Sequence, residues 1–120
     1  MPWSEAERLL HRLLRRLDLP CDWAANQRVT THAGAAYLDA ALPDLMLAFE
    51  VDGFEFHTTR AAFLRDRDRD TALASLGWQV VRIAAAQVIN EPDRVVRRLR
   101  EVVAARLALI GRGSPPRARR

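Results

Sequence analysis

The acidic residues with the clearest chemical potential lie in the segment Ala48 to His57, which reads AFEVDGFEFH. Side chains alternate between the two faces of a β-strand, so Glu50 and Asp52 would share one face, roughly 7 Å apart along the strand. The apolar Phe49 and Val51 would occupy the other face. The pattern therefore predicts two carboxylates held side by side on one strand.

A third carboxylate comes from the preceding strand-like run, Tyr37 to Leu42. A short turn containing proline joins this run to Leu45 to Asp52, and such a hairpin can bring Asp39 beside Glu50 and Asp52. Three converging carboxylates repel one another unless a cation lies between them, and a ligand set of oxygens alone suits Mg²⁺ or Mn²⁺. The sequence thus predicts a site for a hard metal ion.

The hydrophobic pattern predicts the elements that position these acids, in the order α-β-β-β-α-β-α. Ser4 and Glu7 have capping-box spacing at the start of a helix that runs to about Asp18. Gly77 supplies a C-terminal stop for the middle helix. The remaining predicted elements are strands at Gln27 to Thr31, Tyr37 to Leu42, Leu45 to Asp52 and Trp78 to Ile83, and helices at Arg60 to Leu76 and after Asn90 to Asp93.

The middle helix carries acids where an apolar stripe is expected. Asp66 and Asp70 lie at helical spacing on the face defined by Phe63, Leu73 and Ala74. The charges in this helix alternate in sign, which is typical of a solvated, ion-paired helix face. The other interpretation is that Asp66 or Asp70, together with Arg69, faces the carboxylates of the strands.

Composition limits the organisation of the chain. Its 120 residues, 49% of them hydrophobic, fit one domain, predicted over residues 1–110. Residues 111–120 contain four arginines and no acid, account for the formal charge of +4, and are predicted to be a disordered basic tail. This tail either attracts phosphates or is a solvated extension with no role of its own. A single cysteine excludes an internal disulfide, and neither a signal peptide nor a membrane-spanning run is evident, so a cytoplasmic location is expected.

Several of these motifs occur together in one known group of proteins. Leu38-Asp39, the core Glu50 to His57, the Asp66-x-x-Arg69-Asp70 helix and the run Gly77 to Arg82 resemble the restriction-endonuclease-like (PD-(D/E)XK) superfamily. Specifically, they resemble an uncharacterised bacterial branch that is similar to very-short-patch-repair (Vsr) endonucleases. The resemblance implies an α/β (α+β) fold with a central mixed sheet flanked by helices, and metal-dependent hydrolysis of DNA.

The same resemblance implies roles for individual residues. Asp39 would bridge one or two Mg²⁺ or Mn²⁺ ions, Glu50 and Asp52 would complete the cluster, and the Val51 carbonyl would be a further ligand. His57 would move a proton or contact the scissile phosphate. The superfamily's usual motif has a lysine after the second acid, but this chain contains no lysine and Asp52 occupies that position. The Vsr-like branch also lacks this lysine.

Each assignment has a structural alternative. Asp39 can cap a turn, Glu50 and Asp52 can be solvent-facing acids of an edge strand, and Asp52-Gly53 is also a common turn signal. His57 can be an ordinary packed or exposed histidine. Glu7 is a neighbour of the metal site in some relatives, but its capping-box spacing already explains it. Trp78 is expected to pack in the core.

Together these observations predict a metal-dependent DNA endonuclease or nickase with DNA as partner. The alternative from another class is a nucleic-acid-binding or interaction module that keeps the fold without turnover. A chain of this size has little surface for base readout, so a homodimer or a partner protein is also expected.

Overall fold

The computed structural model describes residues 4–53 and 59–113 of the chain. The elements are α1 (Glu5–Arg16), β1 (Ala24–Thr31), β2 (Gly34–Leu42), the 3₁₀ turn η1 (Pro43–Leu45), β3 (Leu47–Asp52), α2 (Arg60–Ser75), β4 (Gln79–Ala84), α3 (Ala85–Asn90) and α4 (Pro92–Gly113). The predicted order α-β-β-β-α-β-α is confirmed, and the sequence pattern missed only the short η1 and α3.

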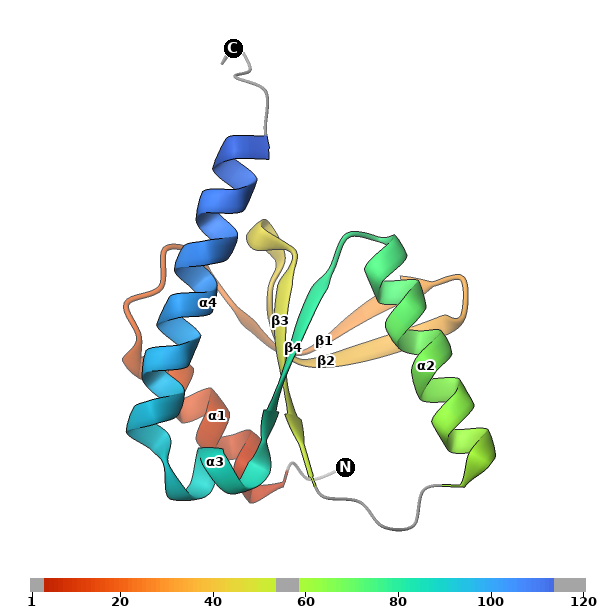
Figure 1. The fold of residues 1–120 in the computed structure, drawn as a ribbon, viewed down its shortest axis with the longest axis horizontal. Helices are drawn as coiled ribbons and strands as arrows, with labels where there is room; N and C mark the ends of the chain where they lie inside the picture. The colour runs from red at the N-terminus through yellow and green to blue at the C-terminus, as the bar shows by residue number, and fades with distance from the viewer. Residues whose placement is uncertain (1–3, 54–58, 114–120) are drawn as a thin grey trace.

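The four strands form one mixed sheet in the order β1-β2-β3-β4. The β1–β2 and β2–β3 pairs are antiparallel, whereas β3 and β4 are parallel and are joined through α2. Helices α1, α3 and α4 lie on one side of this sheet and α2 lies on the other (Figure 1). The predicted α/β (α+β) class with a central mixed sheet flanked by helices is therefore confirmed.

The larger core fills the side of the sheet that α1, α3 and α4 cover. Leucines of α1 and valines of α4 pack there against Leu42, Leu47 and Phe49 of the sheet. Ser4 caps α1 as expected: its hydroxyl accepts from the Glu7 N–H at 3.1 Å, and its own N–H donates to Glu7 Oε1 at 2.8 Å. The apolar stripe of an amphipathic, capped helix thus sets the position of α1 against the sheet.

The core on the α2 side is small and rich in alanine. Only the C-terminal half of α2 reaches it, through the fully buried Leu73. The prediction that Phe63, Leu73 and Ala74 define a buried apolar face of α2 is therefore wrong in part. Leu73 is buried, but Phe63 is 49% exposed and Ala74 is exposed. Trp78 packs against this cluster, as expected.

The ends of the helices follow their sequence signals. Gly77 takes a φ of 96° after α2, a conformation that suits glycine, and so ends the helix. The helix α4 continues to Gly113, so it includes the first residues of the predicted tail, while residues 114–120 lie outside the described part. Near the end of α4 the apolar Leu107 is 40% exposed. None of the helices in the described ranges is long and apolar enough to cross a bilayer.

The sheet divides at Asp39, and this division shapes the candidate site. The ladder between β2 and β3 pairs only residues 40–42 with residues 47–49, whereas β3 pairs with β4 along its whole length. Beyond Ala40 and Phe49 the β1–β2 ribbon diverges from β3 and β4 (Figure 1). We refer to this divergence, between Tyr37–Asp39 of β2 and Glu50–Val51 of β3, as the fork.

The backbone is irregular at the fork. Leu38 belongs to the core on the α2 side, whereas Ala40 belongs to the core on the α1 side, so the alternation of β2 shifts at Asp39. Asn26 lies opposite Asp39 in the β1–β2 register and has a φ of 52°, a conformation that asparagine tolerates better than most residues. A local irregularity of this kind, as in a β-bulge, redirects a side chain and ends regular pairing.

Candidate functional site

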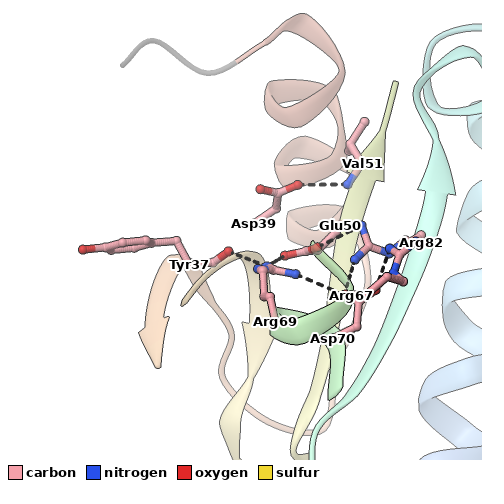
Figure 2. A network of polar contacts seen from close by, with 8 residues as sticks. All are labelled: Tyr37, Asp39, Glu50, Val51, Arg67, Arg69, Asp70 and Arg82. Carbon is pink, nitrogen blue, oxygen red and sulfur yellow. Dashed lines mark hydrogen bonds and ion pairs between the residues drawn. The ribbon is translucent and has the colours of Figure 1, made fainter. Parts of the chain in front are cut away.

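The Asp39 carboxylate replaces a missing ladder hydrogen bond at the fork. The Val51 N–H donates to Asp39 Oδ2 at 2.9 Å, across the point where β2 and β3 separate (Figure 2). On the same fork, Arg69 Nη2 of α2 donates to the Tyr37 carbonyl oxygen at 2.9 Å. Side chains of Asp39 and Arg69 therefore join the two strands where backbone pairing stops.

The Asp39 carboxyl group also meets the Glu7 carboxyl group of α1. Burial, with a hydrogen bond to Glu7 and the charges of Glu7 and Glu50, raises the pKa of Asp39 to about 7, although the Val51 N–H acts in the opposite direction. Glu7 has two functions here, because its Oε1 also accepts the Ser4 N–H of the capping box. The capping-box interpretation of Glu7 is thus confirmed, and a contact with the candidate site accompanies it.

His11 is a residue of this site that the sequence did not reveal. Its side chain is 3% exposed, and its Nε2 lies 2.9 Å from the backbone carbonyl oxygen of Asp39. Since a carbonyl only accepts hydrogen bonds, Nε2 is the donor. The ring also packs against Trp23, with 5.4 Å between ring centroids. The only sequence signal was that His11 follows Glu7 by one helical turn and so lies on the same face of α1.

Glu50 is held by two arginines. It is 5% exposed, with Oε2 at 2.5 Å from Arg69 Nη2 of α2 and Oε1 at 3.5 Å from Arg82 Nη1 of β4. A buried carboxylate needs such partners, because an uncompensated buried charge is costly. Of the two interpretations of the strand acids, a solvent-facing Glu50 is therefore wrong.

Asp70 completes the polar network on the α2 side (Figure 2). Its Oδ1 lies 2.6 Å from Arg82 Nη2, and its Oδ2 lies 2.8 Å from Arg67 Nη2. Burial lowers the pKa of Arg82, but Asp70 and Glu50 outweigh burial and leave that pKa above its ordinary value. Of the two interpretations of the middle helix, the structure therefore agrees with the one in which Asp70 and Arg69 face the strand acids.

The other candidates lie apart from this network. Asp66 is exposed and lines a hollow between α2 and the β1–β2 turn, so it does not face the strand acids. Asp52 is exposed at the end of β3. His57 lies outside the described residues, so its expected role keeps the status of a prediction.

The expected convergence of Asp39, Glu50 and Asp52 on one point is not seen. Within residues 4–53 and 59–113, no group of three or more histidine, cysteine or acidic residues is arranged to hold a metal ion. The physical reason is that Arg69 of α2 and Arg82 of β4 hold Glu50, while Asp39 turns to the Val51 N–H and to Glu7. Sequence spacing places acids on strands but does not reveal which cation from another element reaches them.

Comparison with known proteins identifies relatives of this arrangement. The family model REase_MTES_1575, of a restriction-endonuclease family, matches residues 7–103. Two uncharacterized proteins of Mycobacterium tuberculosis, MT2308 of strain CDC 1551 and Rv2248 of strain H37Rv, are each 39% identical over 79 residues. That alignment covers 64% of this chain and 29% of each relative, so the chain matches less than a third of their length.

A solved structure shares the fold. The catalytic domain of the homing endonuclease I-Bth0305I superposes with a TM-score of 0.68 at 19% identity, covering 87% of this chain and 98% of that domain. At this identity the likeness concerns the fold alone.

Proposed function

Because the chain belongs to the restriction-endonuclease family REase_MTES_1575, we propose that it is a Mg²⁺- or Mn²⁺-dependent DNA endonuclease or nickase that hydrolyses phosphodiester bonds. The observation that carries the proposal is the position of Asp39 at the fork, where its Oδ2 accepts the Val51 N–H at 2.9 Å and its carboxyl group lies beside that of Glu7. Two carboxyl groups in contact, one of them with a pKa raised to about 7, form a partly buried site whose charge a cation would balance.

The donor chemistry fits a hard divalent cation at Asp39 and Glu7, and fits it less well at Glu50. Among the contacts of the described residues, no ion pair joins an arginine to Asp39 or Glu7. The charge of Glu50, by contrast, is already balanced by Arg69 and Arg82. Asp39 and Glu7, with the Val51 carbonyl, would therefore hold the ion. Glu50 and Asp52 would join them only after a rearrangement in which Glu50 leaves at least one arginine.

The chain's own residues would organise the reaction around this pair. A bound ion supplies an activated water and neutralises charge that develops on phosphate oxygens. The Val51 N–H fixes the direction of the Asp39 carboxylate, and His11 fixes the Asp39 backbone. Arg69 and Arg82, which now bind Glu50, could instead bind a phosphate of the substrate, because a guanidinium group pairs well with carboxylates and with phosphates. His57 remains the proposed proton-transfer group.

The test measures metal binding and cleavage with matched variants. We expect Mn²⁺ to bind the parent protein in isothermal titration calorimetry, and Asp39→Asn to lose that binding. Asp44→Asn, which removes an exposed acid from η1, serves as the control and should bind as the parent does. Supercoiled plasmid should be nicked or cut with Mg²⁺ or Mn²⁺ and not with Ca²⁺, whose flexible coordination does not enforce the same geometry. Absence of Mn²⁺ binding at millimolar concentration would contradict the site.

A second candidate function has its own supporting observation. Glu50 engaged by two arginines, in a chain without lysine, suits a module that binds nucleic acid through this fold without cutting it. DNA binding in EDTA, combined with no cleavage of duplex, single-stranded, mismatched or branched DNA in any metal, would favour that function.

A further inference from the structure

A groove runs between the edge strand β4 and the helix α4. It encloses about 270 Å³, with Val81, Ile83 and Val95 forming an apolar floor and Arg94 and Arg98 of α4 at its side. Because β4 is the last strand of the sheet, no neighbouring strand covers this side of it within the described residues. Arginines beside an apolar floor suit a ligand that has both anionic and apolar parts.

The charge of the groove points to an anion. No acid lines it, whereas Arg94 and Arg98 do; Arg82 also borders it, but its guanidinium is paired with Glu50 and Asp70. Arg94 and Arg98 have ion-pair partners on their own helix, Glu91 at 3.1 Å and Glu101 at 2.9 Å. Both arginine side chains are more than half exposed, at 52% and 62%, and exposed pairs of this kind contribute little stability. Phosphate groups can therefore replace these glutamates at little cost.

The groove adjoins a second hollow that reaches the end of β3. Arg82 and Gln87 line both the groove and a second hollow of about 660 Å³. That hollow is bounded at its other side by Asp52 and Gly53, at the end of β3. A chain that occupies the groove can thus reach the end of the strand that carries Glu50 and Asp52.

The size of the groove limits what can enter. Pockets that enclose small ligands have volumes of roughly 300–1,000 Å³, so the groove can accept about one nucleotide and cannot enclose a duplex. Proteins that bind single strands combine a positively charged groove that follows the backbone with aromatic side chains on which the bases stack. In this groove the aliphatic side chains of Val81, Ile83 and Val95 take the place of the aromatic surface.

We propose that the groove between β4 and α4 binds a single-stranded segment of the nucleic acid next to the bond that is cut. Arg94 and Arg98 contact its phosphates, and the valine and isoleucine floor contacts its sugars and bases. This inference rests on the proposed function and adds the form of substrate that the site accepts. A duplex would have to be opened, nicked or frayed at this position for one strand to enter.

The experiment compares two double variants of the same helix. Arg94→Gln/Arg98→Gln removes the groove arginines, and Arg97→Gln/Arg100→Gln removes the same charge from exposed positions that do not line the groove. Binding of a fluorescein-labelled single-stranded oligonucleotide is followed by anisotropy in EDTA over a range of NaCl concentrations. Circular dichroism verifies that both variants are folded.

We expect the groove variant to bind at least fivefold more weakly and to lose about 1.4 from its salt slope, about 0.7 for each phosphate contact with a single strand. The control variant should change less than twofold. Equal losses in both variants, or no binding by the parent protein, would overturn the proposal. A parent protein that prefers intact duplex over single strands would overturn it as well.

The failure of this inference can be separated from the failure of the proposed function. If the parent protein cuts DNA and the groove variant cuts it with unchanged KM, the groove assignment is wrong while the nuclease assignment stands. If the parent protein cuts nothing but shows the expected difference between variants in EDTA, the groove assignment stands without the nuclease.

Discussion

His11 Nε2 donates to the backbone carbonyl oxygen of Asp39 at 2.9 Å, one helical turn from the Glu7 side chain that meets the carboxyl group of the same aspartate. Helix α1 therefore holds Asp39 at both its main chain and its side chain. Together with the Val51 N–H, these contacts fix the residue at the fork, where the β2–β3 ladder no longer does.

Replacing His11 should show whether this contact positions Asp39. His11→Leu should lower the free energy of unfolding by about 1–3 kcal/mol, because it leaves a buried carbonyl without its donor. His11→Gln keeps an N–H donor and should recover part of that loss together with Mn²⁺ affinity. Urea unfolding and Mn²⁺ titration provide the two measurements. Equal Mn²⁺ affinity in the parent and in a folded His11→Leu variant would show that the contact serves packing alone.

The raised pKa of Asp39 predicts a dependence of stability on pH. The pKa of about 7 in the folded protein exceeds the ordinary value of 3.8. Asp39 therefore contributes stability that is fully present below pH 3.8 and is lost as the pH rises through 7. In EDTA, the parent protein should lose on the order of 1–2 kcal/mol more than Asp39→Asn between pH 5 and pH 8, after allowance for solvent screening. Urea unfolding at both pH values measures this difference, and parallel losses in the two proteins would exclude it.

Glu7 offers a way to separate its two contacts. Glu7→Gln retains the capping box, in which glutamine also serves, and removes the carboxyl group that faces Asp39. It should leave stability at pH 5 nearly unchanged, raise stability at pH 8, and weaken Mn²⁺ binding. Glu7→Ala should be less stable than Glu7→Gln by about 0.5–1 kcal/mol through the lost cap contact. Thermal unfolding of both variants at the two pH values, with an Mn²⁺ titration, distinguishes these effects.

The two arginines of α2 that bind acids should differ in importance. Arg69→Met removes a partner of the buried Glu50 and should destabilise the fold by about 2–3 kcal/mol, since Arg82 compensates only in part. Arg67→Met breaks a pair whose arginine is 50% exposed and should cost less than about 1 kcal/mol. Chemical denaturation of both variants measures the contrast. Similar losses would mean that the Glu50–Arg69 pair carries no special weight.

The order of elements could be predicted because each has a local signal. The capping-box residues Ser4 and Glu7 mark the start of α1, and Gly77 marks the end of α2. The apolar runs of the sequence lie where β3 and β4 contribute buried or half-buried side chains. These features depend on neighbours in the sequence, and local patterns contain that information.

The contacts of the site could be predicted only in part. Spacing placed Asp39 and Glu50 on adjoining strands, but the shift in alternation at Asp39 coincides with a positive φ at Asn26, which lies on another strand. The partners of Glu50 come from α2 and β4, 19 and 32 residues along the chain. No periodicity within one element reveals such pairs. The interior of the β4–α4 groove likewise arises from two elements that only the fold brings together.

The shallow attachment of α2 has a consequence for the motions of the protein. This helix buries only Ala72 and Leu73, and its N-terminal half has no core beneath it, so it should open locally at a lower free energy than the strands. Its amides should then exchange with deuterium well before those of β3, and each opening would detach Arg69 from Glu50. The charge state of the fork would thus fluctuate with the folding of a single helix, and any ligand that competes for Arg69 or Glu50 would alter the exchange rate of α2.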